Sequence, residues 1–251
     1  MDLMIINQPR VFPYRRVYQI AKRMMDLILC LLLFPLILPL MALCVLAIRI
    51  SSPGPAIFVQ GRIGKGGRLF RMYKLRTMHH NLDDSFHRAF MRAFVTGQIG
   101  NDEGKNGRNG NFPRAFKNAF VSSQSGNNGN GKQKIYKPIQ RSQVTWVGRI
   151  LRKTSLDELP QIINVFKGEM SLVGPRPNVP WEVEEYRSWH NERLEVLPGI
   201  TGLAQVRGRS GISFDHIVEY DIEYLENQSL VLDLKILWWT LITALLGTGA
   251  E

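Results

Sequence analysis

The sequence predicts a mainly α-helical, monotopic membrane protein with a small β-hairpin, short strands and a re-entrant apolar segment. Three observations lead to this fold class. No charged residue occurs from Leu27 to Ile48, a run long enough to reach across a bilayer as a helix. Ala56–Gln60 and Leu69–Met78 are strand-like and are separated by a glycine-rich turn. Much of the remaining chain has the spacing of amphipathic helices, some of them placed at the membrane interface.

The chain divides into three parts along its length. Residues 1–26 are a basic N-terminal segment, residues 27–50 are the apolar segment, and residues 51–251 form one cytoplasmic domain that contains a duplicated insertion at 80–141. The formal net charge of +11 predicts an anionic partner: nucleic acid, acidic lipid headgroups or a phosphorylated substrate. The two cysteines both lie in the apolar segment and give no disulfide framework.

The apolar segment is predicted to enter the membrane and return to the same face. Pro35 and Pro39 interrupt it, and each removes a backbone hydrogen bond and bends a helix. Basic residues flank both ends, Lys22 and Arg23 before it and Arg49 after it. A spanning helix normally has its excess of Lys and Arg on one side only. A kinked spanning helix stays open as the alternative, because such helices are tolerated.

The segment that follows the apolar run contains a cationic, glycine-rich stretch, Gly61–Arg68. It lacks the Lys-Ser/Thr ending of a P-loop, so a plain hairpin turn and a phosphate-binding turn stay open. The insertion at 80–141 contains two similar copies, at 88–101 and 114–127, with Asn/Gly-rich spacers. Phenylalanines recur every four residues in each copy. As helices, the copies would lie at a membrane interface or bury their aromatic stripes in the protein, and the sequence does not distinguish the two.

The C-terminal half is predicted to be mostly helical. Helices are expected from Pro160 to Phe166, from Pro180 to Val196 and from Phe214 to Asn227. Between the last two, residues 198–209 are expected to form a turn that leads into a short strand. Residues 232–246 are apolar with paired tryptophans and are expected to form a helix that lies on, or dips into, the membrane surface.

Two adjacent carboxylates, Asp157 and Glu158, stand out in this basic chain. Ser155-x-x-Glu158 matches a helix capping box, which is the simplest interpretation, although Pro160 fits it poorly. Either way, the carboxylates are expected at a helix N-terminus, where the dipole favours anions. Cationic residues that could bind phosphate accompany them: Lys74, Arg76, Arg149, Arg152, Arg176, Arg207 and Arg209. Such surroundings are expected to depress the pKa of both carboxyls.

This inventory suits phosphate chemistry at a membrane surface. An ionised aspartate can attack phosphorus, and a neighbouring glutamate can hold Mg²⁺ against phosphate oxygens. Phosphoryl transfer depends mainly on positioning, metal and positive charge. From the residues alone, the chain is either an enzyme acting on phosphates or a basic scaffold that binds anionic lipid or nucleic acid.

Several long motifs occur in one order. They are Lys22-Arg23-x-x-Asp26, Ser52-Pro53-Gly54-Pro55-Ala56-Ile57-Phe58-x-Gln60-x-Arg62-x-Gly64, Tyr73-Lys74-Leu75-Arg76-Thr77-Met78, Thr154-Ser155-Leu156-Asp157-Glu158-Leu159-Pro160-Gln161, Gly168-Glu169-Met170-Ser171-Leu172-Val173-Gly174-Pro175-Arg176-Pro177, Pro198-Gly199-Ile200-Thr201-Gly202-x-Ala204-Gln205-Val206 and Tyr220-Asp221-Ile222-x-Tyr224-x-x-Asn227-x-Ser229-Leu230-x-x-Asp233-Leu234-Lys235. Together they strongly resemble the bacterial sugar transferase family, the monotopic polyprenyl-phosphate phosphoglycosyl transferases. The resemblance covers roughly residues 16–79 and 142–247, and no motif matches the insertion at 80–141.

The resemblance implies an activity and a set of site residues. Such enzymes transfer a sugar phosphate from a UDP-sugar to undecaprenyl phosphate and release UMP, initiating a surface glycan such as exopolysaccharide, capsule or O-antigen. Asp157 would be the nucleophile that carries a covalent phosphosugar, and Glu158, with Asp157, would hold Mg²⁺. The expected substrate contacts are Lys74, Arg76, Arg152, Arg176, Gln205, Arg207 and Asp221, although Arg176 could equally clamp a loop.

The resemblance also implies where the protein acts. The expected place is the cytoplasmic face of a bacterial inner membrane, against an anionic leaflet and without nucleic acid. Larger members carry additional N-terminal membrane helices, so this chain is expected to be close to the minimal catalytic unit. The sequence does not reveal the sugar, and it leaves a homo-oligomer open.

Overall fold

The computed structural model describes residues 16–79, 85–98, 143–208 and 212–246. Its helices and strands are α1 (Arg16–Ser51), β1 (Ile57–Ile63), β2 (Leu69–Leu75), α2 (Ser85–Val95), α4 (Trp146–Lys153), α5 (Ile162–Lys167), β3 (Ser171–Val173), α6 (Pro180–Val183), β4 (Gly199–Thr201), α7 (Leu203–Gly208), α8 (Phe214–Glu226) and α9 (Leu230–Leu246). Three 3-10 helices complete the described part: η1 (Lys65–Gly67), η3 (Leu156–Gln161) and η4 (Ser188–Glu195). The prediction of a mainly helical fold with a few short strands is therefore confirmed.

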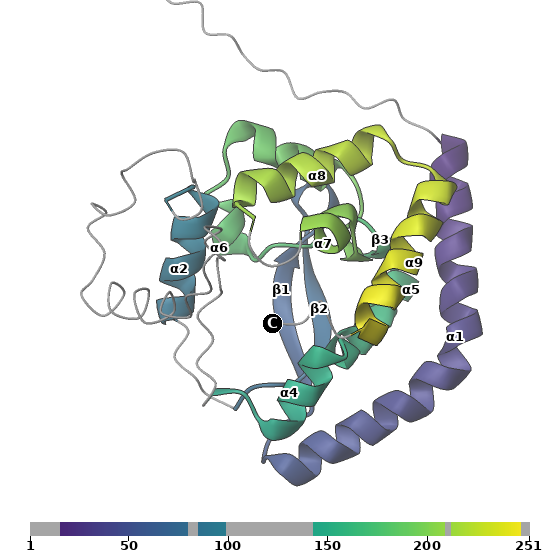
Figure 1. The fold of residues 1–251 in the computed structure, drawn as a ribbon, viewed down its shortest axis with the longest axis vertical. Coiled ribbons are helices and arrows are strands. Elements are labelled where there is room, and N and C mark those ends of the chain that lie inside the picture. Colours follow the sequence, from purple (N-terminus) through teal and green to yellow (C-terminus); the bar gives the residue numbers. More distant parts are fainter. Residues whose placement is uncertain (1–15, 80–84, 99–142, 209–211, 247–251) are drawn as a thin grey trace, which may run out of the picture.

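Helix α1 is one continuous helix, and it is bent. It runs through Pro35 and Pro39, and Figure 1 shows its two arms meeting at an angle along one side of the domain. Each proline removes a backbone N–H and its ring crowds the preceding turn, which bends the helix without ending it. The structure thus shows a bend in one continuous helix, and the re-entry of this segment stays a prediction.

The middle of α1 exposes its apolar side chains. By length and composition α1 could cross a membrane, and only 11% of its most apolar 18-residue window is buried inside the protein. Leu31, Leu32 and Leu36 are each about two-thirds exposed. A core helix of a soluble protein would bury these side chains. The exposed apolar surface of α1 therefore indicates membrane association.

The N-terminal arm of α1 is attached to the domain by polar contacts. Arg23 donates to the carbonyl oxygens of Val165 (2.6 Å) and Phe166 (3.1 Å), in the last turn of α5. Helix C-termini have unpaired carbonyls that favour a cation, so this contact caps α5. Asp26, also on α1, accepts a hydrogen bond from the hydroxyl of Ser171 on β3 at 2.7 Å.

A buried carboxylate joins α1 to the C-terminal helices. Asp233 on α9 is fully buried and forms a 3.0 Å ion pair with Lys22. It also accepts hydrogen bonds from the hydroxyls of Tyr18 (2.9 Å) and Tyr224 (2.7 Å). Charged and phenolic groups therefore satisfy both oxygens of this carboxylate, which ties α1, α8 and α9 together.

Removal of this carboxylate should strongly destabilise the protein. We expect Asp233→Ala to lower the free energy of unfolding by about 3 kcal/mol or more, because it leaves the Lys22 ammonium without its partner in a largely buried site. Thermal unfolding in detergent micelles measures the effect. Glu223→Ala is the matched control, since it breaks an ion pair to Arg207 in which both side chains are more than 40% exposed. Equal midpoints for the two variants would contradict the expectation.

The predicted hairpin is confirmed. Strands β1 and β2 pair antiparallel, in register from Ile57 opposite Leu75 to Ile63 opposite Leu69. Figure 1 shows the hairpin near the centre of the domain, with helices around it. Phe70, Met72 and Leu75 of β2 are buried. Lys74, on the same strand, reaches η3, where its ammonium donates to Glu158.

A second, parallel pair of strands brings two glycines into close contact. Ser171 of β3 lies opposite Gly199 of β4, and Val173 lies opposite Thr201. A Cβ atom on Gly199 would lie 2.1 Å from the backbone nitrogen of Gly174. No side chain fits there, so the backbone beyond β3 is pressed against β4. This close approach sets the start of the Pro175–Pro177 turn.

One prediction for the C-terminal half is wrong, and another is incomplete. Residues 180–196 do not form one helix: α6 ends at Val183, and the 3-10 helix η4 follows. Arg187 is extended between them, where its N–H donates to Nδ1 of His190, so the continuous helix is interrupted. The range 198–209 does contain a short strand, β4, but the chain then enters the helix α7, which was not predicted. The helix predicted at Phe214–Asn227 is confirmed as α8.

The insertion is described only over its first copy. Phe90 and Phe94 of α2 are buried against Phe214 and Val218 of α8. The rings of Phe94 and Phe214 meet edge to face, with centroids 6.0 Å apart. The aromatic stripe of this copy therefore packs inside the protein, and the interpretation of this copy as a membrane-interface helix is wrong. The second copy, at 114–127, lies outside the described residues.

Helix α9 lies beside the N-terminal arm of α1 (Figure 1). It carries exposed apolar side chains, among them Val231 (62% exposed), Trp238 (61%) and Leu241 (51%). This exposure fits the predicted membrane-surface helix, which stays a prediction.

Candidate active site

Asp157 and Glu158 lie in the first turn of η3, directly after a sharp reversal of the chain. Helix α4 ends at Lys153, and Ser155 adopts a left-handed conformation with φ of 55°. It is the non-glycine residue with positive φ in the described part of the chain. This conformation costs about 1 kcal/mol for a residue with a Cβ, and such strain gathers at functional sites. The reversal turns the two carboxylates toward β2.

The capping box predicted here is wrong. The side chain of Ser155 makes no capping hydrogen bond, and only its carbonyl oxygen accepts from the backbone N–H of Glu158, at 3.2 Å. The left-handed backbone of Ser155 carries its hydroxyl away from the position of a cap. The carboxylate of Glu158 instead meets two cations. The dyad does lie at the N-terminal end of a helical segment, as predicted, since η3 continues into α5.

One oxygen of Glu158 receives both cations. The ammonium of Lys74, on β2, lies 2.9 Å from Oε1, and Nη1 of Arg176 lies 3.1 Å from the same oxygen. The side chains of Lys74 and Glu158 are less than one-fifth exposed, and that of Arg176 is 42% exposed. Residues from β2, η3 and the turn after β3 thus meet at a partly open site.

The two acids have opposite pKa shifts. Burial opposes the ionisation of Glu158, but Arg176 and Lys74 outweigh it and lower the pKa of Glu158 to about 2. Burial, and then the charge of Glu158, raise the pKa of Asp157 above its ordinary value, although Lys74, Arg176 and Arg152 pull it down. The expectation that cations depress both pKa values therefore holds for Glu158 and is wrong for Asp157, because burial was not readable from the sequence.

Arg152 approaches the dyad from α4. Its Nε donates to the hydroxyl of Thr77 at 2.9 Å. Helix α4 lies unusually close to the end of β2: a Cβ atom on Gly148 would fall 2.0 Å from the carbonyl oxygen of Thr77. Only glycine allows this approach. It places Arg152 where its charge acts on Asp157.

The structure therefore brings five predicted site residues together: Lys74, Arg152, Asp157, Glu158 and Arg176. The other four have their described partners elsewhere. Arg76 is buried and donates to the carbonyl oxygens of Ser52 and Pro53, both at 2.8 Å, so it holds the turn before β1. Gln205, on α7, donates to the carbonyl oxygen of Ile200 at 3.2 Å.

Arg207 and Asp221 are also engaged in pairs of their own. Arg207 on α7 forms a 2.6 Å ion pair with Glu223 on α8. Asp221, also on α8, is 2% exposed and lies 2.7 Å from Nη2 of Arg193. Neither contact involves the dyad.

Two arginines that were not predicted as site residues hold the turn carrying Arg176. Arg62 on β1 donates to the carbonyl oxygen of Pro177 at 3.0 Å, and Arg193 on η4 donates to that of Arg176 at 3.0 Å. Arg62 was visible as part of a cationic, glycine-rich stretch and as a motif position, but neither signal gave it a role. Arg193 lies within the range 180–196 that was predicted as one helix, and no local signal pointed to its burial.

The donor set at the dyad fits a hard divalent cation that shares its ligands with a phosphate. Both described ion pairs of Glu158 end on Oε1, which leaves Oε2 and the Asp157 carboxylate as the anionic oxygens available. Within the described ranges, no group of three or more His, Cys, Asp or Glu side chains could form a complete metal site. Mg²⁺ commonly takes only one or two protein carboxylates, and water and substrate phosphate supply the rest. The dyad matches that pattern.

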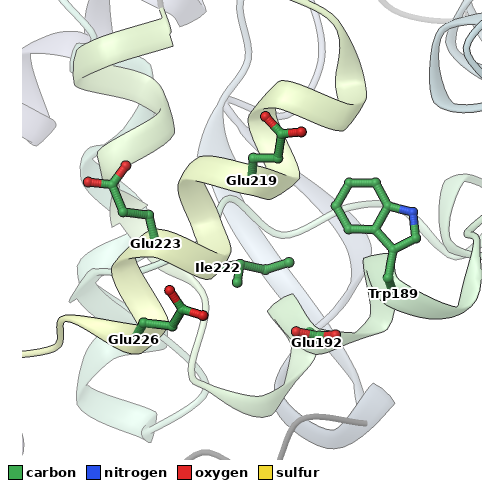
Figure 2. Close-up of a pocket in the computed structure, with 6 residues that line it drawn as sticks. All are labelled: Trp189, Glu192, Glu219, Ile222, Glu223 and Glu226. Carbon is green, nitrogen blue, oxygen red and sulfur yellow. The ribbon is translucent and has the colours of Figure 1, made fainter. Parts of the chain in front are cut away.

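A separate groove lies between η4 and α8 and has a different character (Figure 2). It has a volume of about 380 Å³ and is lined by Trp189, Glu192, Glu219, Ile222, Glu223 and Glu226. Its charged side chains are all carboxylates, so its field repels phosphate groups. The cationic site around the dyad, and not this groove, suits a phosphorylated ligand.

Comparison with known proteins decides the family. The family model for "Bacterial sugar transferase" matches residues 17–247. The chain belongs to the bacterial sugar transferase family. The match spans α1, the dyad and α9, so the elements that meet at the candidate site all lie within the family domain.

Named relatives of this bacterial sugar transferase differ in length. It is 36% identical over 239 residues to galactosyl transferase CpsE of Streptococcus agalactiae, a match that covers 95% of this chain and 45% of that protein. It is 33% identical over 231 residues to the exopolysaccharide production protein ExoY of Sinorhizobium fredii (92% and 88%). It is 37% identical over 237 residues to the UDP-glucose:undecaprenyl-phosphate glucose-1-phosphate transferase of Caulobacter vibrioides (91% and 71%). The chain thus spans less than half of CpsE but most of ExoY.

Proposed function

We propose that this sugar transferase moves a sugar 1-phosphate from a UDP-sugar to undecaprenyl phosphate, releases UMP and so initiates a surface glycan. The observation that carries the proposal is the pair Asp157 and Glu158, in which Lys74 and Arg176 hold Glu158 while Asp157 is left to react. The names of relatives such as the Caulobacter enzyme support the same substrates.

The reaction proceeds in two displacements at phosphorus. A carboxylate oxygen of Asp157 attacks the β-phosphorus of the UDP-sugar, a new P–O bond forms, and the bond from that phosphorus to the bridging oxygen breaks. UMP leaves with the electron pair, and the sugar phosphate stays on Asp157. The phosphate oxygen of undecaprenyl phosphate then attacks the same phosphorus, which frees the Asp157 carboxylate and yields the lipid diphosphate sugar.

The cations of the site assist by charge and by position. Lys74 and Arg176 fix Glu158, and with Arg152 they supply positive charge next to Asp157. This charge favours binding of the diphosphate and stabilises the negative charge that develops on the leaving UMP. The raised pKa of Asp157 also makes its carboxylate more basic than an ordinary aspartate, which improves a nucleophile as long as it is ionised.

The dyad carboxylates are the groups that would hold Mg²⁺. When bound, the ion neutralises phosphate oxygens and orients the diphosphate for in-line attack. Lys74 and Arg176 both pair with Oε1 of Glu158. Oε2 is therefore the oxygen of Glu158 that would bind the metal ion.

The pH dependence of the first displacement reports on Asp157. We expect single-turnover UMP release to rise with pH along a limb whose apparent pKa lies above that of an ordinary aspartate, because the ionised carboxylate attacks and burial raises its pKa. Arg152→Gln should move the limb to higher pH, since it removes a cation that lowers the pKa of Asp157.

Arg149→Gln is the matched control for this profile. Arg149 lies on the same helix, α4, and is exposed. Its replacement should leave the limb in place. Equal displacement of the limb in both variants, or a limb at or below the ordinary aspartate value, would contradict the role given to Asp157.

We infer that α1 enters the membrane and returns to the same, cytoplasmic face of the inner membrane. The bend at Pro35 and Pro39, the exposed apolar middle and the basic residues at both ends support this arrangement. Single cysteines introduced at Asn7 and Asn81, in a chain whose Cys30 and Cys44 are replaced by serine, should then react with an impermeant reagent from the same side. Labelling from opposite sides would establish a spanning helix.

The proposed reaction is tested directly with a panel of UDP-sugars. The purified protein, undecaprenyl phosphate and Mg²⁺ are combined with each UDP-sugar, and released UMP is measured. We expect UMP release with at least one sugar, dependent on undecaprenyl phosphate for multiple turnovers. Failure with every sugar in the panel would overturn the proposed function.

A further inference from the structure

The turn Pro175–Asn178 carries Arg176. Each of its four carbonyl oxygens accepts a hydrogen bond from another part of the protein. The backbone N–H of Gly199 donates to Pro175 O at 2.9 Å, Arg193 Nη2 to Arg176 O at 3.0 Å, Arg62 Nη1 to Pro177 O at 3.0 Å, and the backbone N–H of Ile63 to Asn178 O at 2.9 Å. The two prolines have no N–H of their own, so this turn depends on donors from other elements. Two of the four donors are guanidinium groups.

Arg193 makes the most contacts to this region. Its side chain is 2% exposed. Besides Arg176 O, it donates through Nη1 to Oδ1 of Asn178 (3.1 Å) and to the hydroxyl of Tyr186 (3.1 Å). A planar guanidinium can serve these acceptors at once, because its donors diverge in fixed directions. Arg193 therefore fixes the backbone at Arg176 and the side chain two residues later.

Asp221 is the counterion of this arginine. Its carboxylate lies 2.7 Å from Nη2 of Arg193, and both side chains are 2% exposed. Burial raises the pKa of Asp221 to about 6, although the charge of Arg193 pulls it down. A buried ion pair contributes little net stability compared with apolar residues, so its presence calls for a role in geometry.

Arg176 needs such support because its own side chain is long and 42% exposed. A flexible arginine loses rotamer freedom when it pairs with a carboxylate, and an exposed pair is weak. Anchoring the backbone of Arg176 reduces this cost. It limits the positions from which the guanidinium can reach Glu158, so the 3.1 Å contact is maintained.

We propose that Arg193, neutralised by Asp221, is a positioning residue that holds the Pro175–Asn178 turn so that Arg176 stays on Glu158. This inference rests on the proposed function for its effect on turnover. It gives Asp221 an indirect role through Arg193, in place of the substrate contact expected from its motif. The effect on catalysis then passes through Arg176 alone.

A double-mutant cycle tests this route. Arg193→Lys keeps a charge beside Asp221 but loses the planar fork. It should lower kcat for UMP release by about 10- to 100-fold, the cost of a small misplacement at a reacting site, and change KM for the UDP-sugar little. In an Arg176→Met background, the same change should cost less than about twofold, because the group that it positions is gone. Asp221→Asn is the second variant and should behave in the same way.

Controls and outcomes separate positioning from general damage. Arg187→Lys, on an exposed arginine that pairs with Asp215 just before η4, should leave kcat unchanged in both backgrounds. Losses at Arg193 and Arg176 that simply multiply would overturn the proposal, since they would show that Arg193 does not act through Arg176. Full activity of Arg193→Lys would overturn it equally.

Hydrogen exchange decides the inference independently of turnover. In Arg193→Lys, the amides of the non-proline residues within 174–179 should exchange faster than in the wild type, while those of α5 should not change. Unchanged exchange over 174–179 would overturn the proposal. If the wild-type protein releases no UMP with any sugar, the proposed function fails, and the exchange result alone then supports or overturns the positioning role.

Discussion

Asp157→Asn should reduce UMP release by on the order of 10³-fold or more, because it removes the oxygen that forms the bond to phosphorus. The amide is nearly isosteric with the carboxylate, so Lys74, Arg176 and Glu158 should keep their positions in the variant. The loss of activity can then be assigned to the missing oxygen. Fixed-time assays of UMP with the preferred UDP-sugar measure the loss. Intact-mass spectrometry provides a second measurement, since the wild type incubated without undecaprenyl phosphate should gain the mass of one sugar phosphate and the variant should not.

The matched control for this variant is Glu223→Gln, an acid in an exposed ion pair with Arg207. Its turnover should match that of the wild type. Substantial turnover or a mass adduct in Asp157→Asn would eliminate Asp157 as the nucleophile, whatever the fate of the other assignments.

Glu158→Gln should lower kcat by roughly 10²- to 10³-fold through the loss of preorganised charge at the site. The variant leaves Lys74 and Arg176 without the carboxylate that they share, and it removes the oxygen that we assign to Mg²⁺. It also removes the charge that helps to raise the pKa of Asp157. The acid limb of the pH profile should therefore move to lower pH while turnover falls. Titration of activity with Mg²⁺ should show that more metal is needed for half of the remaining activity.

Glu184→Gln is a suitable control because Glu184 follows α6 and is exposed. We expect its kcat and Mg²⁺ dependence to be those of the wild type. A Glu158→Gln variant with unaltered Mg²⁺ dependence would show that the metal, if required, is bound elsewhere.

Local patterns predicted the elements whose structure depends on neighbours in sequence. The alternation of Leu69–Met78 predicted β2, and the uncharged run predicted the apolar middle of α1, since each signal is contained in a few turns or residues. The acid pair was placed correctly at the start of a helical segment. Its capping box failed because the left-handed conformation of Ser155 cannot be read from a serine.

Features that depend on tertiary packing were beyond the sequence. The raised pKa of Asp157 follows from burial by elements distant in the chain, which a count of nearby arginines does not show. In the same way, the sequence marks Asp221 only as a motif position and gives no sign that Arg193 is its partner. Only the folded chain brings them together under the Arg176 turn.

The attachment of α1 to the domain has a consequence for the lipid substrate. Arg23 caps the end of α5, the helix that continues from the dyad, and Lys22 is paired with Asp233 on α9. These polar contacts fix α1 against the part of the domain that carries Asp157. Under the proposed function and the proposed membrane placement of α1, this attachment would hold Asp157 at a set distance from the bilayer surface, where it would meet the phosphate of the acceptor rather than its isoprenoid chain.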